Sequence, residues 1–260
     1  MTRAAPAYPE GHSILEDKTV LITAAAGAGI GFATAKRCIE EGARVMISDI
    51  HEERLAEAAA ALSEITGMPT PCRICNVTDE DEVLALIGTA EEELGHIDVL
   101  VNNAGLGGES RIVDMSDEAW SAVQDVTLNG TFRMTRAALK HMYRRESGVI
   151  VNISSVIGWR AQPGQAHYAA AKAGVMALTR VAAAESAEHG VRVNAVSPSF
   201  ASHPFLEKVM DKSDLDRLEA AEMYGRGAET WEVANVIVFL ASDYSTYMTG
   251  EVVSVSSQHP

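Results

Sequence analysis

Short apolar runs alternate with longer segments of helical periodicity along the whole chain, and this alternation limits the possible folds more than any other feature. Apolar residues recur at helical spacing near 55–62, 83–94, 117–145 and 167–189, and residues 32–41 also have the pattern of a helix. Strand-like runs lie between the helical segments, at 20–23, 44–49, 72–77, 97–104, 148–155, 191–198 and 251–256. This order predicts an α/β fold in three layers, with helices covering both faces of a mostly parallel, seven-stranded sheet.

Length, composition and charge restrict the class of protein further. The chain has 260 residues, of which 47% are hydrophobic, so it can bury the core of one domain. Its formal net charge of −15 argues against nucleic acid or an anionic membrane surface as a partner. No apolar run reaches the ~18 residues of a membrane span, and residues 1–13 lack the apolar segment of a signal peptide. We therefore expect a cytoplasmic protein with a flexible arm at 1–13 and a single domain at 14–260.

Cysteine and histidine residues give no sign of a metal site. Cys72 and Cys75 have the spacing of a redox or metal pair, but no second Cys or His pair accompanies them. They also fall in a strand-like run, where residues three apart point to opposite faces. We expect them to be core or near-core thiols.

The first strand-like run leads into a glycine-rich turn, Thr23 to Gly31, and then into a helical segment. Such a turn lets backbone N–H groups approach a pyrophosphate at a helix N-terminus. Asp49 ends the second run eighteen residues after Gly31, where its carboxylate can accept both ribose hydroxyls of NAD and would repel the 2′-phosphate of NADP. The turn contains no Lys or Arg to offset that repulsion, so NAD is favoured over NADP. Asp49 could instead be a strand-end turn residue or helix cap.

Three residues around the fifth strand carry the most specific chemistry. Ser155 ends that strand, and Tyr168 and Lys172 are one helical turn apart on one face of the next helix. A cation at hydrogen-bonding range would lower the phenol pKa from ~10, so that Tyr168 could carry a proton near neutral pH. A neutral hydroxyl such as Ser155 can hold a carbonyl or alcohol oxygen. A helical Tyr and Lys at this spacing can also be a simple surface pair.

Taken together, these motifs resemble the short-chain dehydrogenase/reductase family over residues 15–257. The resemblance rests on the glycine turn, Asn102-Asn103-Ala104-Gly105, the set Ser155, Tyr168 and Lys172, Arg192-Val-Asn194 and Thr249-Gly250. It implies a Rossmann-like fold, a nicotinamide cofactor and a homotetramer packed through the long helices and the last strand. It also implies that Tyr168 transfers the proton, Ser155 orients the substrate oxygen and Lys172 binds the nicotinamide ribose while tuning Tyr168. The cofactor contacts implied by the family are Thr23, Gly27, Gly29, Ile30, Asp49, Asn76, Val77, Asn103, Ala104, Gly105, Tyr168, Lys172 and Pro198.

Several positions depart from the family pattern. Ala24 stands where the turn usually has glycine, and we expect Gly27 to supply the conformational freedom that Ala24 lacks. Thr127 replaces a catalytic Asn, and we expect it to hold a relay water less well, unless another group does so. Asn129 is two residues further round a helix and would face nearly the opposite way. Ser199 follows Pro198 in place of glycine, and Ser257-Gln258 replaces a common Gly-Gly.

The substrate is expected to lie beside Ser155 and Tyr168. Residues 203–225 have the amphipathic pattern of an apolar lid. Trp159, Arg160 and His203 are the tentative substrate residues, with Arg160 meeting a carboxylate or phosphate unless it is a solvated loop charge. Within the family, the chain looks most like actinobacterial dehydrogenases of steroid catabolism, which act on a ring hydroxyl of a bicyclic indane-type acid carried as its coenzyme A thioester.

These features predict an NAD-dependent dehydrogenase that moves a hydride between nicotinamide and a secondary alcohol or ketone, with oxidation as the expected direction. The partner is then a small molecule, possibly a coenzyme A thioester. Two alternatives stay open. One is an NADPH-dependent 3-oxoacyl thioester reductase, against which Asp49 speaks. The other is a non-catalytic nucleotide-binding sensor.

Overall fold

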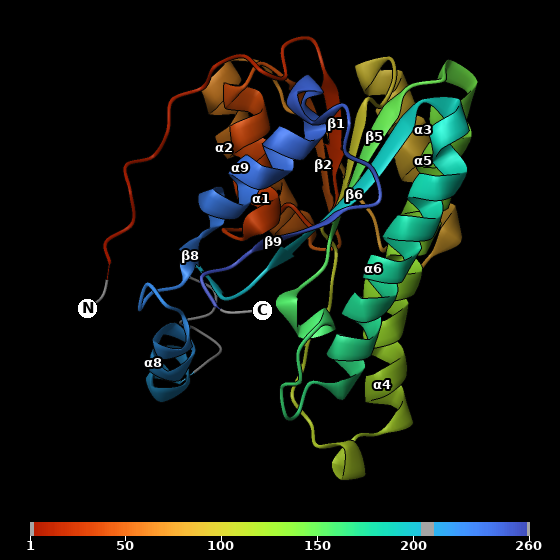
Figure 1. Cartoon of the computed structure of the whole chain (residues 1–260). Coiled ribbons are helices and arrows are strands. Elements are labelled where there is room, and N and C mark those ends of the chain that lie inside the picture. The colour runs from red at the N-terminus through yellow and green to blue at the C-terminus, as the bar shows by residue number, and fades with distance from the viewer. Residues whose placement is uncertain (1–2, 204–210, 259–260) are drawn as a thin grey trace.

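The computed structural model describes residues 3–203 and 211–258. Its main sheet has seven strands in the order β3-β2-β1-β4-β5-β6-β9, and every neighbouring pair is parallel. The α/β fold expected from the alternation is therefore confirmed (Figure 1). The strands are β1 (Thr19–Ile22), β2 (Arg44–Asp49), β3 (Cys72–Ile74), β4 (Val99–Asn102), β5 (Gly148–Ile153), β6 (Val191–Pro198) and β9 (Val252–Val255).

Helices cover both faces of this sheet, which gives the three layers visible in Figure 1. One face carries α1 (Ile30–Glu40), α2 (Glu52–Thr66) and α9 (Thr230–Ala241). The other face carries α3 (Glu80–Leu94), α5 (Gly130–Arg145) and α6 (Ala166–Ser186). Side chains alternate across a strand, so successive strand residues pack into the hydrophobic cores on opposite faces of the sheet. Val20 and Ile22 pack on the first face and Leu21 packs on the second. Both faces are therefore closed to solvent.

The segment expected to be one helix near 117–145 is divided. It forms α4 (Asp117–Gln124), a π-helical turn (Asp125–Asn129) and α5. A π-turn widens the helix by one residue per turn and often marks a functional position. Here it carries Thr127, which is fully buried, whereas Asn129 is exposed. The opposite orientation expected for these two side chains is confirmed.

A ladder of buried polar side chains links the second helical layer through the sheet. Asn102 Nδ2 donates to Thr135 Oγ1 at 3.0 Å and to Asn152 Oδ1 at 2.9 Å. Asn152 Nδ2 in turn donates to Thr179 Oγ1 at 2.9 Å. The ladder joins α5, β4, β5 and α6. Buried amides are costly unless they are hydrogen-bonded, so these bonds stabilise the packing of the two helices on the sheet. Asn102, at the start of the Asn-Asn-Ala-Gly motif, is thus a packing residue.

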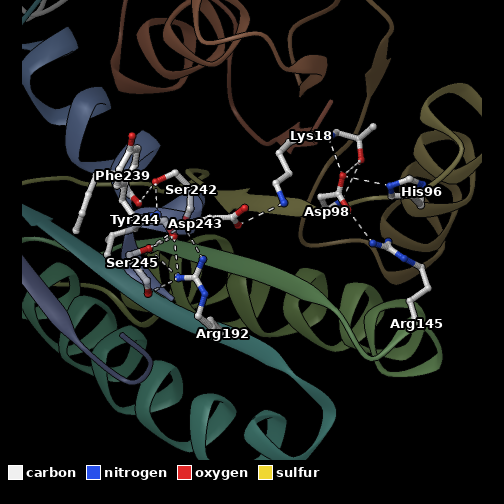
Figure 2. Close-up of polar contacts among 12 residues, drawn as sticks. Lys18, His96, Asp98, Arg145, Arg192, Phe239, Ser242, Asp243, Tyr244 and Ser245 are labelled. Atoms are coloured by element: carbon white, nitrogen blue, oxygen red, sulfur yellow. Dashed lines mark hydrogen bonds and ion pairs between the residues drawn. The ribbon is translucent and has the colours of Figure 1, made fainter. Parts of the chain in front are cut away.

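Polar contacts also hold the amino-terminal edge of the sheet (Figure 2). Asp98, just before β4, accepts hydrogen bonds from Thr19 N at 2.9 Å and from Arg145 Nη2 at 2.8 Å. Arg192 in β6 donates to the carbonyl oxygens of Leu240, Ser242 and Ser245 at 3.0 to 3.1 Å. Arg192 therefore satisfies carbonyls at the C-terminus of α9, which have no partner within the helix.

The arm at the N-terminus runs over α1 and α9. Residues 3–13 form no helix or strand, but several side chains hold them in place. The Tyr8 hydroxyl donates to Glu40 Oε2 at 2.6 Å, and its ring meets the edge of Trp231 at a centroid distance of 5.5 Å. The backbone N–H of His12 donates to buried Glu41 at 2.8 Å. The flexibility predicted for 1–13 stays a prediction, although these contacts anchor its second half.

The structure describes part of the segment expected to form a lid, and it corrects one of the two cysteine predictions. The structure places α8 (Lys212–Ala221) and the short pair β7 (Ala201–Ser202) and β8 (Ala228–Glu229) in and around the segment 203–225, of which 204–210 lie outside the described residues. The expectation of a core thiol is wrong for Cys72, which is exposed because β3 is a short edge strand. It is confirmed for Cys75, which is buried. None of the described helices is both long and apolar enough to cross a membrane.

We predict that Arg192→Met lowers the free energy of unfolding by about 2–4 kcal/mol, because several carbonyl oxygens lose a charged donor. Urea unfolding would measure this loss. Arg217→Met is the matched control: that side chain lies on α8, is 68% exposed and pairs with Asp214. The control should change stability by less than about 0.5 kcal/mol. Equal effects of the two substitutions would contradict the helix-capping role.

Candidate active site

The predicted site residues gather at the carboxyl ends of the strands. The strand order reverses between β1 and β4, and loops leaving such a point diverge to opposite faces and open a crevice. Two clefts lie there and share Gly105. One, of about 510 Å³, is lined by residues that include Asp49, Arg54, Asn76, Val77 and Ala104. The other, of about 470 Å³, is lined by Ile30, Asn103, Gly107, Ile153, Ser154, Ser155, Tyr168, Lys172, Pro198, Ser199, Phe200, Ala201 and His203, besides Gly105.

The glycine-rich turn differs from expectation in its backbone. Ala24 itself adopts the left-handed conformation, with φ of 52°, and Gly27 has φ of 91°. The expectation that Gly27 stands in for Ala24 is therefore wrong, because both residues take positive φ and Ala24 does so against the steric cost of its Cβ. Gly31 is needed for a different reason: a Cβ there would lie 2.5 Å from Ala24 O and from Asn103 Nδ2. The turn and the loop after β4 are in close contact at this point.

Two side chains fix that contact. Thr23 Oγ1 accepts hydrogen bonds from the backbone N–H groups of Asn103 and Ala104, at 3.0 and 3.1 Å. Asn103 Nδ2 donates to Ala24 O at 2.8 Å. Thr23 is 1% exposed, so its hydroxyl works as an internal brace. The brace keeps the N-terminus of α1 beside the loop that contains Gly105.

Asp49 lies at the far end of the first cleft. Its Oδ2 accepts from Ala26 N and its Oδ1 from His51 N, both at 3.1 Å. Burial raises the pKa of Asp49, while the backbone hydrogen bonds and the charge of Arg54 lower it in part. The carboxylate thus braces the glycine turn, as the turn-residue alternative supposed, and still lines the cleft.

Arg54 is a functional candidate that sequence reasoning missed. It lies in α2, five residues after Asp49, and lines the same cleft. The glycine turn itself contains no Lys or Arg, but Arg54 of α2 brings a cation to the same cleft, and its charge lowers the pKa of Asp49 in part. The position of α2 gave a usable signal: a helix that starts at the carboxyl end of a strand presents its first turn to the same edge.

Ser155, Tyr168 and Lys172 meet in the second cleft. Ser155 follows β5 and is 8% exposed, and it shares a side-chain hydrogen bond with Tyr168. Lys172 Nζ lies 5.5 Å from the centroid of the Tyr168 ring and donates to Ile153 O at 2.6 Å. Because α6 begins at Ala166, the Tyr and Lys side chains leave one face of its first two turns, as predicted.

The expected lowering of the pKa of Tyr168 is not found. Burial raises the pKa of Tyr168, and the hydrogen bond with Ser155 offsets this only in part. Burial also lowers the pKa of Lys172, to about 8. The reason is geometric: the Lys172 ammonium bonds to the Ile153 carbonyl rather than to the phenol.

Thr127 takes a structural role at this site. Its hydroxyl accepts from Leu106 N at 2.9 Å and donates to Leu106 O at 3.1 Å. A Cβ on Gly105 would lie 3.8 Å from Thr127 Oγ1 and 3.3 Å from Lys172 Nζ, so these groups surround the loop together. The single proton of Thr127 is used by Leu106, which leaves the hydroxyl only acceptor capacity for a relay water. That Thr127 holds such a water less well than Asn stays a prediction.

The three tentative substrate residues are placed differently from one another. His203 lines the second cleft, and burial lowers its pKa. Trp159 and Arg160 lie at the end of a 3₁₀ turn (Val156–Gly158), and neither lines a described part of that cleft. Trp159 is 50% exposed, and Arg160 Nη1 donates to Gln258 Oε1 near the C-terminus.

The two clefts suit a dinucleotide. They form an extended crevice past the uncapped N-terminus of α1, with a buried carboxylate at one end and the Ser-Tyr-Lys set at the other. Gly105, where they meet, has no side chain, and a Cβ there would lie 3.3 Å from the ammonium of buried Lys172. Metal chemistry has less support: the described residues contain no group of three His, Cys, Asp or Glu side chains able to hold an ion.

A further cleft of about 400 Å³ lies at the opposite, amino-terminal edge of the sheet. Its charged side chains are engaged in the contacts of Figure 2. Lys18 pairs with Asp243 at 3.4 Å, Asp98 with Arg145, and Arg192 with the carbonyls after α9. The titratable groups of this cleft therefore hold the fold together, and we place the active site at the other edge.

Comparisons with known proteins agree with this geometry. The family model described as "Enoyl-(Acyl carrier protein) reductase" matches residues 24–257. A Mycobacterium tuberculosis protein named (5R,7aS)-5-hydroxy-7a-methyl-1-oxo-2,3,5,6,7,7a-hexahydro-1H-indene-carboxyl-CoA reductase is 58% identical, over 98% of each chain. The 3-oxoacyl-[acyl-carrier-protein] reductase FabG of Thermotoga maritima is 42% identical over 93% of this chain and 97% of its own.

A solved structure supports the same assignment. The crystal structure of a short chain dehydrogenase from Mycobacterium smegmatis superposes with a TM-score of 0.88, at 53% identity and over 99% of each chain. The narrower resemblance to enzymes of indane-type thioesters is borne out by the name of the tuberculosis relative. The chain belongs to the short-chain dehydrogenase/reductase family and is an oxidoreductase of that family.

Proposed function

We propose that the protein is an NAD-dependent dehydrogenase that transfers a hydride between nicotinamide and a ring hydroxyl or ketone of a coenzyme A thioester. The observation that carries this proposal is the meeting of Ser155, Tyr168 and Lys172 in a cleft that continues to Asp49. A non-catalytic nucleotide-binding sensor would not require a phenol, a hydroxyl and an ammonium buried together. When bound, the nicotinamide accepts or supplies the hydride.

In the proposed reaction, this chain's own residues move one proton. Ser155 and Tyr168 share a hydrogen bond and would hold the substrate oxygen between their hydroxyls. Tyr168 would take the alcohol proton during oxidation and return it during reduction. Lys172, with a pKa of about 8, still carries its charge in most molecules at pH 7. It would bind the nicotinamide ribose and favour the phenolate once its ammonium turns from Ile153 O toward the phenol.

The substrate class is supported by the relative from Mycobacterium tuberculosis. That protein is named for a hydroxylated hexahydroindene joined to coenzyme A, and its name ends in reductase. We propose that this chain acts on a similar bicyclic thioester. NAD and an oxidised ring ketone remain our proposed cofactor and product, and a reversible enzyme would catalyse both directions.

A second candidate is an NADPH-dependent 3-oxoacyl thioester reductase. Arg54 favours this candidate, because a cation in the cofactor cleft can bind a 2′-phosphate. The Thermotoga maritima relative carries a 3-oxoacyl reductase name. We rank this candidate lower because Asp49 is buried in the cleft, whereas Arg54 is exposed and can turn away.

We also propose a homo-oligomer, which in this family is expected to be a tetramer. A groove of about 390 Å³ runs between α5 and α6 and is lined partly by Phe132, Leu139 and Val181. Phe132 and Val181 are 43% and 56% exposed. Exposed apolar side chains along two long helices suit packing against a second copy.

We predict that Tyr168→Phe lowers kcat at least a thousandfold, because a phenyl ring cannot transfer the proton and the Ser155 hydroxyl is a much weaker acid than a phenol. The phenyl ring keeps the packing, so the Kd for NADH should stay within threefold of wild type. Stopped-flow hydride transfer and nicotinamide fluorescence measure the two quantities. Turnover by Tyr168→Phe at a rate close to that of the wild type would contradict the proposed mechanism.

Cofactor preference gives a second prediction. Wild-type protein should bind NADH roughly tenfold to a hundredfold more tightly than NADPH, since Asp49 opposes a 2′-phosphate by about 1–3 kcal/mol. Asp49→Asn should narrow that ratio by strengthening NADPH binding. Arg54→Met is the matched control and should widen it. Fluorescence titration of all three proteins decides between the candidates, and a wild-type preference for NADPH would favour the 3-oxoacyl reductase.

The pKa of Lys172 predicts how stability depends on pH. Its folded-state value of about 8 lies below the ~10.4 of an unfolded chain, so between these values the unfolded state binds the proton and the folded state does not. The free energy of unfolding of the wild type, minus that of Lys172→Met, should therefore increase as the pH rises above 8. The increase should be up to ~1.4 kcal/mol per pH unit. Urea unfolding of both proteins without cofactor at pH 7.5, 8.5 and 9.5 tests this. Parallel stability curves for the two proteins would show that burial does not perturb Lys172.

A further inference from the structure

The C-terminal tail is joined to the substrate side of the cleft through one buried carboxylate. Glu222 is 4% exposed and follows α8, at the end of the predicted lid. Its Oε2 accepts from Ser257 Oγ at 2.7 Å, and its Oε1 accepts from Gln258 Nε2 at 2.7 Å and from Phe200 N at 3.2 Å. A buried carboxylate is stable only when donors surround it, and here they come from two separate segments, the C-terminal tail and the segment after β6.

Gln258 connects Glu222 to the loop between Ser155 and Tyr168. Its Oε1 accepts a hydrogen bond from Arg160 Nη1, while its Nε2 donates to Glu222. A guanidinium can only donate and a carboxylate can only accept, so the orientation of the Gln258 amide is fixed by its two neighbours. Gln258 therefore joins a cation to an anion that do not touch each other.

The joined segments adjoin the proposed substrate position, because the loop 156–165 directly follows Ser155, which lines that cleft. Phe200 lines the cleft that holds Ser155 and Tyr168. Arg160 directly follows Trp159, and its own backbone N–H donates to Val156 O at 3.0 Å. Arg160 Nε is buried and, within the described residues, has no hydrogen-bond partner, so the bond to Gln258 is an important constraint on this side chain.

We propose that Gln258 is a positioning residue for substrate binding, which holds Arg160 and the loop 156–165 at the substrate side of the cleft by anchoring them to Glu222. This inference rests on the proposed function, because it assumes that substrate binds between that loop and the segment after β6. The tail acts on substrate affinity and leaves the Ser155, Tyr168 and Lys172 chemistry unchanged.

The test compares Gln258→Met with a polarity swap. Methionine keeps the size of the side chain and removes both hydrogen bonds. Gln258→Glu sets two carboxylates against each other, whereas Glu222→Gln combined with Gln258→Glu restores a donor and an acceptor at reversed positions. Ser254→Ala, on an exposed position of β9, is the matched control.

For a hexahydroindene-carboxyl-CoA substrate, Gln258→Met and Gln258→Glu should each raise KM about tenfold, as expected for loss of a hydrogen bond to a charged group. Their kcat should change less than twofold, and the Kd for NADH should be unaltered. The double variant should recover KM to within about threefold of wild type. An unchanged KM in Gln258→Met would overturn the proposal. So would a parallel loss of kcat, NADH affinity and melting temperature, or a double variant without recovery.

Hydrogen exchange gives a readout that needs no substrate. The amides of Gly158, Trp159 and Arg160 are hydrogen-bonded within the loop. Their exchange in the cofactor-free protein should speed up about tenfold in Gln258→Met and return toward wild type in the double variant. Unchanged exchange would refute the anchoring even if turnover of the thioester failed. A wild-type protein that binds NADH but does not turn over the thioester would instead count against the proposed function.

Discussion

Burial of the sheet on both faces is the constraint on which the rest of the structure depends. With α1, α2 and α9 on one side and α3, α5 and α6 on the other, polar chemistry can reach solvent only at the strand ends. All seven strands are parallel, so their carboxyl ends share one edge. Ligand-binding loops therefore collect at that edge, and the amino-terminal edge is left to structural contacts such as those of Arg192 and Asp98.

A small set of hydrogen bonds turns this edge into a defined site. The Thr23 hydroxyl holds the loop after β4, and the Asp49 carboxylate holds the glycine turn. Both residues were predicted to contact the cofactor, and in the structure both also brace the backbone that would receive it. Thr127, which was expected to hold a relay water, braces the loop after β4 through its hydrogen bonds with Leu106. Bracing and binding are compatible, since a rigid cradle loses less entropy when it binds a ligand.

The electrostatics of the catalytic set show why geometry must accompany motif recognition. A Tyr and a Lys at helical spacing suggested a phenol with a lowered pKa. Burial raises the pKa of Tyr168 instead, because Lys172 bonds to Ile153 O rather than to the phenol, and the hydrogen bond with Ser155 offsets the effect of burial only in part. The shift expected for catalysis thus depends on where the Lys172 ammonium points. Spacing along a helix fixes which face a side chain leaves, but not its terminal contact.

The sequence by itself determined the strands, the helical layers and the grouping of Ser155, Tyr168 and Lys172, because period-two and helical patterns are local properties and strand ends share an edge. Only the tertiary structure decided the rest. The π-turn around Thr127 depends on packing against the loop after β4, and the left-handed Ala24 is held by that loop too. Arg54 enters the cofactor cleft through the placement of α2, and Gln258 meets residues 36 and 98 positions away. Contacts between segments so distant arise from the folded arrangement and leave no periodic signal in the chain.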